Sequence, residues 1–408
     1  MIYIDNKYNV VNILDKIIFL CCFLYSLTFL TDIKINFLTT AASFGLIKLI
    51  YVRPNIEINT KFFYLVGLFV ICTFLSVILN DVSSISGENL SAYKSRFISP
   101  LIGILMIFLF KFTEKHILTF LAGLSCSLLL NAFFVIYQFS QGMTGRLVGF
   151  ASNYMLLCAM NILILPIIFS LALYKSNISN KLRIFFLTTV IVNIPAVVLE
   201  NTRIVWIALF IVYLMIILVS LKRKRNAFIL IVAMIICSGV FFYNSPQSIE
   251  RFNSITNVSY QNQSNYERLL MWQSAGNMFI EHPFFGVGVG NYHEQYMNNY
   301  RSLYSREDQW HPHNVPLAML SETGIVGGIS YFLLFIYLFY NGINTYRKKK
   351  NIASFAYLMC LTAYSINCLT DSMFCGHNIK SPTTFFWLFT GFYLILNKYI
   401  SISYDKRI

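Results

Sequence analysis

Charged side chains are scarce in this sequence, and carboxylates are the scarcest of them. Asp and Glu supply 17 of the 408 residues and Lys and Arg supply 31, so that charged residues make up 12% of the chain. Because soluble globular proteins carry about 25% charged residues, this chain falls outside their class. Its hydrophobic fraction of 57% and mean hydropathy of +0.63 indicate a polytopic membrane protein instead.

Several motifs of nucleotide-dependent enzymes and hydrolases are also absent. The sequence has no P-loop, no DxD carboxylate pair, and no G-x-S-x-G or H-E-x-x-H motif. These absences argue against a reaction driven by ATP or by a nucleotide sugar, so a transfer donor would have to carry its own activation. Of nine cysteines, eight lie in apolar runs as small hydrophobes and Cys375 lies in a polar loop. Neither a disulfide framework nor a cysteine metal site is indicated.

Apolar runs long enough to span a membrane recur along the chain. They predict an all-α integral membrane protein of about twelve transmembrane helices, with one large loop that contains an amphipathic helix. The expected domains are transmembrane helices 1 to 9 in residues 1–244, the loop in 245–317, and transmembrane helices 10 to 12 in 318–408. The runs are 16–32, 35–51, 62–80, 98–113, 116–138, 151–174, 184–200, 204–221, 227–244, 318–341, 353–370 and 382–399.

The basic residues orient these helices. If each run crosses once, clusters such as Lys222–Arg225 and Arg347–Lys350 fall on one side, which the positive-inside rule makes cytoplasmic together with both termini. The net charge of +14 therefore reflects topology, and no nucleic-acid partner is indicated. No small-residue cleavage site follows the first run, which indicates a retained helix. The larger loops on the other side are 81–97, 139–150, 245–317 and 371–381.

The 245–317 loop is too long to lack structure in a compact protein. Ser264 and Glu267 fit a capping box, and Pro283 follows the end of the helix that the box would begin. Alternating glycines in 286–290 come next. Because no Rossmann strand or Walker lysine accompanies them, a tight turn towards the membrane is favoured over a phosphate cradle. The apolar positions that repeat at helical spacing are Leu269, Trp272, Ala275, Gly276 and Phe279.

His311 and His313 stand two residues apart near the end of this loop. A zinc site would need further ligands that the sequence does not clearly supply. A general base is the more attractive chemistry, because imidazole titrates near pH 6.5 and a carboxylate such as Glu322 would orient it. Asn314 is well placed to cap the helix that follows. The alternative is that these residues only close the loop.

Arginines on the same side are candidate anion ligands. Arg203 lies between two strongly apolar runs, where it either snorkels to the interface or offers a planar charged fork to a phosphate oxygen. Arg268 falls in the first turn of the predicted amphipathic helix. There it either lies on a solvated face or joins the helix dipole in a diphosphate contact. Arg96, Arg146 and Lys380 are weaker candidates.

Together these residues resemble the O-antigen ligase and polymerase superfamily of bacterial envelopes, and the motif-bearing part covers about residues 195–330. The resemblance is closest to the ligases. Three motifs carry it: Thr202-Arg203 at the start of a helix, Glu267-Arg268-x-x-Met271-Trp272 with a helix that runs to His282-Pro283-Phe284-Phe285-Gly286-Val287-Gly288, and His311-x-His313-Asn314 followed by Glu322-x-Gly324-x-x-Gly327.

The resemblance implies a metal-independent, inverting glycosyltransferase without a cofactor, in the bacterial inner membrane, with a site that faces the periplasm. The donor would be a glycan on undecaprenyl diphosphate. The acceptor would be lipid A-core for an O-antigen ligase of lipopolysaccharide biosynthesis, or a second lipid-linked repeat unit for a polysaccharide polymerase. His313 would be the base that activates the acceptor hydroxyl, and Arg203 and Arg268 would hold the diphosphate. Supporting candidates are His311, Asn314, Glu322 and Arg146.

A polysaccharide or small-anion transporter is a third hypothesis, in which the intramembrane arginine would bind the substrate. The sequence shows no convincing internal repeat of the kind that transporters often contain. Paired histidines in a large outer loop also have no evident use in transport.

Overall fold

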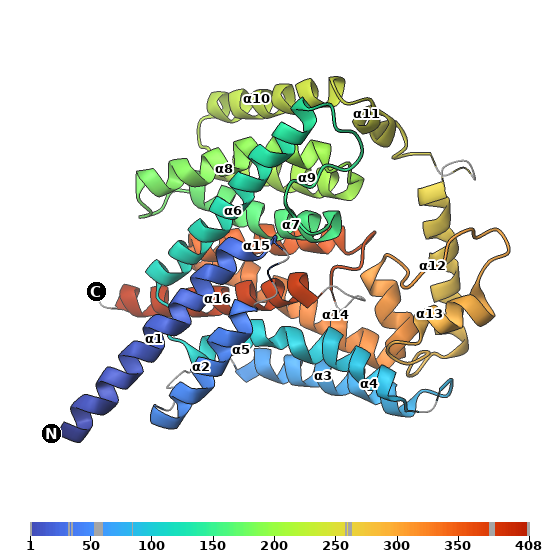
Figure 1. The fold of residues 1–408 in the computed structure, drawn as a ribbon, viewed down its shortest axis with the longest axis horizontal. Coiled ribbons are helices and arrows are strands. Elements are labelled where there is room, and N and C mark those ends of the chain that lie inside the picture. The colour runs from blue at the N-terminus through green and yellow to red at the C-terminus, as the bar shows by residue number, and fades with distance from the viewer. Residues whose placement is uncertain are drawn as a thin grey trace.

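A computed structural model describes residues 2–31, 33, 36–52, 60–83, 85–257, 259, 263–374 and 380–405. Within these residues the secondary structure consists of helices and no strands (Figure 1). The expectations for Cys375 fall outside the described residues. The helices are α1 (Ile2–Thr28), α2 (Phe37–Tyr51), α3 (Thr60–Leu79), α4 (Gly87–Tyr93), η1 (Lys94–Ile98), η2 (Ser99–Leu101), α5 (Ile102–Leu109), α6 (Glu114–Ser140), α7 (Tyr154–Leu173), α8 (Asn180–Leu199), α9 (Arg203–Ser220), α10 (Lys224–Tyr243), α11 (Pro246–Asn253), α12 (Gln263–Glu281), α13 (Tyr292–Gln295), η3 (Tyr296–Tyr300), α14 (Val315–Lys349), α15 (Ile352–Asn367) and α16 (Lys380–Asp405).

The predicted class, an all-α polytopic membrane protein, is confirmed. Among the described residues, nine helical segments are long and apolar enough to cross a membrane, and α2 and α15 are shorter apolar helices. Each of the twelve predicted runs overlaps a helix, counting α16 for the last run.

The helices differ widely in how deeply they are packed. In α7, 89% of the spanning segment is buried, and it contacts α8, α9 and α15, so it forms the centre of the bundle. In α10 only 6% is buried, which places this helix at the edge. The N-terminal end of α1 and the C-terminal end of α16 lie at one end of the molecule, and α12 and α13 lie at the other (Figure 1). This agrees with a large loop that faces away from both chain ends.

The fourth span begins earlier than predicted. Residues 81–97 were expected to form an outer loop, but helical structure starts at Gly87 and continues through η1, η2 and α5 to Leu109. Arg96 makes this possible. Its guanidinium is buried against Glu322 of α14, with Nη1 2.7 and 2.9 Å from the two carboxylate oxygens. Because the ion pair neutralises both charges inside the protein, the polar stretch can be part of the bundle.

The glycine-rich turn of residues 286–290 packs against a break in α14. Gly324 has φ 60° and ψ −162°, so the helix is interrupted there. The N–H of Ile325 therefore donates to the carbonyl of Pro283 at 2.7 Å, and the carbonyl of Ser321 accepts from the N–H of Val287 at 2.9 Å. The incoming chain thus replaces the hydrogen bonds that the break removes from the helix.

This contact requires glycine at its closest point. Gly286 has φ 67°, and a β-carbon there would lie 2.5 Å from the carbonyl oxygen of Ser321. Residues 286–290 therefore form a tight turn, and their glycines allow the two backbones to pack closely.

The amphipathic helix is α12, but its first turn and its buried face differ from the prediction. The helix begins at Gln263, so Ser264 lies inside it and is not the N-cap. Glu267 is buried and accepts hydrogen bonds from the Ser305 hydroxyl at 2.8 Å and the Arg306 N–H at 2.7 Å. Ala275 is buried as predicted, but the other buried apolar positions are each one residue away from a predicted one, because the helix packs on Tyr292 and Tyr296. Its buried apolar members are Leu270, Met271, Ala275 and Met278.

Candidate active site

A polar cavity of about 680 Å³ opens between the turn before α9, the helices α11 and α12, and the segment that leads into α14. Three of the predicted site residues, Arg146, Arg268 and His313, line it and come from distant parts of the chain. The lining residues are Gly145, Arg146, Tyr154, Asn201, Gln247, Glu250, Arg251, Ser254, Ser264, Glu267, Arg268, Met271, Glu307, Gln309 and His313.

Arg203 is held against the wall of this cavity. A tight turn, in which Asn201 has φ 54°, ends α8 and starts α9 at Arg203. The guanidinium donates to the hydroxyl of Ser254 at 3.0 Å and to the hydroxyl of Ser264 at 3.0 Å. These partners are neutral, and no carboxylate of the described residues forms an ion pair with Arg203. The guanidinium is thus held by two residues of the 245–317 loop.

Three further arginines line the cavity: Arg146, Arg251 and Arg268. Burial lowers the pKa of Arg268, the Asp371 carboxylate opposes this effect, and Arg146 and Arg251 lower it further. Arg146 lies over the ring of Tyr154, 4.1 Å from its centroid. Within the described part of the chain, none of these three guanidinium groups forms an ion pair with a carboxylate. The carboxylates of Glu250, Glu267 and Glu307 also line the cavity. Guanidinium groups that form no ion pair with them can bind an anion with several oxygens.

His313 is presented to the cavity by a strained backbone. Its φ of 48° lies in the left-handed region, which costs a non-glycine residue about 1–2 kcal/mol. The neighbouring residues hold this conformation. Pro312 accepts a hydrogen bond from the Trp272 indole at 2.9 Å. Asn314 caps α14, as predicted, by accepting from the Leu317 N–H at 2.9 Å.

Asp371 is the carboxylate that faces His313. Its Oδ1 lies 3.5 Å from His313 Nδ1, an ion-pair distance that is longer than a well-formed hydrogen bond. Burial opposes ionisation of Asp371, but His313, the Ser372 N–H and His311 together hold its pKa below the ordinary value. His311 lies beside His313, with ring centroids 4.2 Å apart, and its Nδ1 is 3.0 Å from the Ser372 hydroxyl. The pair thus has a carboxylate that orients one ring and a hydroxyl that contacts the other.

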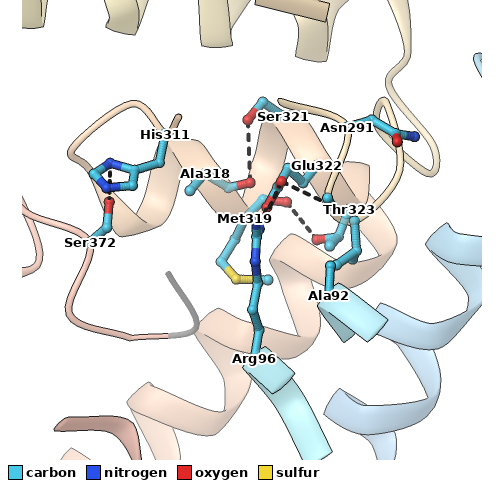
Figure 2. Close-up of polar contacts among 12 residues, drawn as sticks. Ala92, Arg96, Asn291, His311, Ala318, Met319, Ser321, Glu322, Thr323 and Ser372 are labelled. Carbon is cyan, nitrogen blue, oxygen red and sulfur yellow. Dashed lines mark hydrogen bonds and ion pairs between the residues drawn. The ribbon is translucent and has the colours of Figure 1, made fainter. Parts of the chain in front are cut away.

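Glu322 does not have the role that we expected. It was predicted to orient the histidines, but its oxygens are taken by Arg96 and by the Gly290 N–H at 3.1 Å (Figure 2). The reason is the direction of the side chain, which points from α14 towards η1 and the glycine turn. Glu322 is therefore a structural partner of Arg96, and Asp371 is the carboxylate beside His313.

Two residues of the site were missed by the sequence reasoning. Asp371 had a usable signal, since it is the sole carboxylate between residues 323 and 404 of the sequence. Arg251 had none, because its place depends on how α11 folds against the turn before α9. The described residues bring together no group of three or more His, Cys, Asp or Glu side chains that would hold a metal ion.

The fold and the cavity together define a multi-pass membrane protein with an arginine-rich, histidine-bearing site at one end of its helical bundle. Residues 188–332, about a third of the chain, match the family model described as O-antigen ligase, which assigns this segment to the O-antigen ligase superfamily. The match includes Arg203, Arg268 and His313. A comparison with curated proteins finds no match. The family implies a glycosyltransferase-like enzyme with lipid-linked glycan substrates.

Proposed function

We propose that the protein is an O-antigen ligase, which transfers a glycan from undecaprenyl diphosphate to lipid A-core at the periplasmic face of the inner membrane. One observation carries the proposal. Arg146, Arg251 and Arg268 line the same cavity as His313, and Arg203 donates to two serines of its wall. A base and a cluster of unpaired cations are the two groups that metal-independent transfer from a lipid diphosphate needs.

The chemistry follows from the properties of these groups. His313 takes the proton from an acceptor hydroxyl while the hydroxyl oxygen bonds to the anomeric carbon of the donor sugar. The bond from that carbon to the diphosphate oxygen breaks, and its electron pair leaves with the diphosphate. Attack opposite to the leaving group inverts the anomeric configuration. Asp371 then stabilises the imidazolium that has formed.

The arginines act mainly on the leaving group. Negative charge on the diphosphate grows as the glycosidic bond breaks, so cations placed around it bind the transition state more strongly than the ground state. Burial and the neighbouring cations Arg146 and Arg251 also lower the pKa of Arg268, because they act against its positive charge. Diphosphate binding would relieve this repulsion.

An apolar groove beside the cavity supports a lipid-linked donor. It has a volume of about 510 Å³ and lies between α8, α9 and α10. Phe252 and Ile255 line the groove, while Arg251 and Ser254, their neighbours in sequence, line the cavity. A polar head site next to an apolar groove suits a diphosphate that carries a long hydrocarbon chain.

The experiment that tests the assignment is deletion of the gene, followed by gel analysis of lipopolysaccharide and of polymer on the lipid carrier. Loss of all glycan-decorated lipopolysaccharide, with long chains retained on undecaprenyl diphosphate, is the expected result. A core that carries one repeat unit would identify a polymerase instead, in which the acceptor is a second lipid-linked repeat unit. An unchanged ladder would contradict both and point to a transporter.

The role of His313 is tested by His313→Asn, since Asn adopts left-handed backbone more readily than most residues. Loss of the base should lower transfer about 10²- to 10⁴-fold without unfolding the protein. His282→Asn is the matched control, because His282 lies on the same insert with its Nδ1 2.8 Å from Asp81. Retained transfer by a correctly inserted His313→Asn protein would exclude His313 as the base.

A further inference from the structure

Trp310 forms an aromatic stack on the insert that the proposed reaction does not use. Its indole lies parallel to the imidazole of His293, with the ring centroids 3.9 Å apart and an angle of 5° between the planes. Half of the Trp310 surface is nevertheless exposed to solvent. A large aromatic side chain that is both fixed and exposed is a surface prepared for a ligand.

Two hydrogen-bond acceptors fix the imidazole of His293 in this stack. Nδ1 of His293 lies 3.1 Å from the Asp308 carboxylate and 3.2 Å from the Gln309 carbonyl oxygen. Both are acceptors, so Nδ1 carries the proton and the imidazole plane is fixed. His293 belongs to α13, which Tyr292 anchors in the small core beneath α12. Because the ring is fixed before a ligand arrives, little conformational entropy would be lost on binding.

The position of Trp310 connects this stack to the cavity. Gln309, the preceding residue, lines the cavity, and so does His313, three residues further along the chain. Trp310 therefore belongs to the short segment that borders the cavity and carries His313.

The chemistry around Trp310 favours a sugar over a lipid. The residues immediately before it are Glu307, Asp308 and Gln309. Asp308 contacts His293, and the Gln309 amide donates to Glu307 at 2.6 Å. A carboxylate has more than one acceptor site, so these two carboxylates can also accept from the hydroxyl groups of a sugar. The C–H face of a pyranose ring packs well on an indole, because both surfaces are apolar.

We propose that Trp310, supported by His293, is the platform on which a pyranose ring of the acceptor glycan stacks, so that its hydroxyl is directed to His313. This proposal depends on the glycosyl transfer proposed above, since it assigns one subsite of that reaction. Trp310 binds the acceptor and takes no part in proton transfer.

The test uses the full-length protein in nanodiscs, with core oligosaccharide released from lipopolysaccharide as the probe. Tryptophan fluorescence of the wild type should be quenched saturably, and Trp310→Phe should remove that change. In transfer assays, Trp310→Ala should raise the KM for the acceptor at least tenfold and leave the KM for the lipid-linked donor unchanged. Trp310→Phe keeps an aromatic face and should restore most of the acceptor affinity.

Tyr304→Ala is the matched control, because Tyr304 is an aromatic residue of the same insert, 66% exposed and outside the stack. Its acceptor KM should equal that of the wild type. An unchanged acceptor KM in Trp310→Ala would overturn the proposal, as would a Trp310 fluorescence change caused by phospholipid vesicles without sugar. If the wild type binds the oligosaccharide through Trp310 and yet transfers no glycan, the result supports Trp310 as a sugar-binding residue and contradicts the transferase assignment.

Discussion

Arginine is used in opposite ways in two regions of this molecule. At the break in α14, Arg96 is buried and both oxygens of Glu322 face its guanidinium. Around the cavity, Arg146, Arg251 and Arg268 have no carboxylate ion pair among the described residues, and Arg203 donates to serine oxygens. In the first region the charges of Arg96 and Glu322 neutralise each other, so no ligand is needed. The second has guanidinium groups that an anionic ligand can pair with, because the carboxylates of Glu250, Glu267 and Glu307, which line the same cavity, form no ion pair with them.

The difference separates a structural site from a functional one. A buried ion pair contributes little net stability, but it is costly to break from one side only. A cluster of like charges is costly as it stands and becomes favourable when an anion binds. Substitution should therefore affect folding in the first region and catalysis in the second.

The largest effect is expected when the paired region is broken. Glu322→Ala leaves the Arg96 charge buried without a partner and should lower the free energy of unfolding by about 3–5 kcal/mol. Thermal unfolding of the purified protein in detergent measures this. The double variant Arg96→Met with Glu322→Leu removes both charges and should recover most of the loss. A single variant as stable as the wild type would mean that the pair is not a structural element.

Removal of one cation from the cavity should lower activity and leave the stability of the fold unchanged or higher. Arg268→Ala should lower kcat about 10²- to 10³-fold, as loss of one donor to a developing negative charge does, and should leave the melting temperature unchanged or higher. The matched control is Arg301→Ala, an arginine of the same insert that donates to Ser305 and does not line the cavity. Equal losses of activity in both variants would contradict the distinction between the two regions.

Asp371 should have an intermediate effect, since it is a partly exposed carboxylate whose partner is the candidate base. Asp371→Asn keeps the shape and removes the charge that stabilises the imidazolium. We expect transfer to fall about ten- to hundredfold, which is part of the contribution of a positioned base. Single-turnover rates at saturating donor measure this, and an unchanged rate would argue that the 3.5 Å contact has no catalytic role.

The same residue makes a prediction about pH. The pKa of Asp371 is depressed in the folded protein. Its charge therefore adds stability above the unfolded pKa, and this contribution is lost as the pH falls through the folded value. Melting temperatures of the wild type should decline as the pH drops below the ordinary Asp value of 3.8, and Asp371→Asn should flatten the decline. Parallel pH curves for the two proteins would contradict the depressed pKa.

The smallest effect is expected at the rim of the cavity. Arg146 is exposed and lies 4.1 Å from the Tyr154 ring centroid. Arg146→Lys keeps the charge but weakens this contact, so the KM for the donor should rise only about two- to fivefold, the effect of an exposed cation–π contact of 0.5–1 kcal/mol. Steady-state kinetics at two salt concentrations measure it. A loss as large as that of Arg268→Ala would place Arg146 among the principal diphosphate ligands.

The sequence predicted elements that depend on local pattern and missed contacts that depend on packing. The apolar runs mark the helices because a membrane span needs a continuous apolar segment. Arg203, Arg268 and His313 were proposed from their motifs; Arg268 and His313 line the same cavity, and Arg203 donates to two serines of its wall. Asp371 and Arg96 were misjudged because their partners lie on other helices, and nothing in the spacing of residues tells which way a side chain points across a bundle.

The contact between Gly286 and the break at Gly324 has a consequence for how the protein tolerates change. A β-carbon at Gly324 would overlap the Phe284 carbonyl, and one at Gly286 would meet the backbone of Ser321 and Glu322. The obstacle in both cases is main chain, which no second substitution can shorten. In a saturation mutagenesis screen these two positions should accept almost nothing but glycine, although neither lines the cavity, and second-site suppressors should be rare.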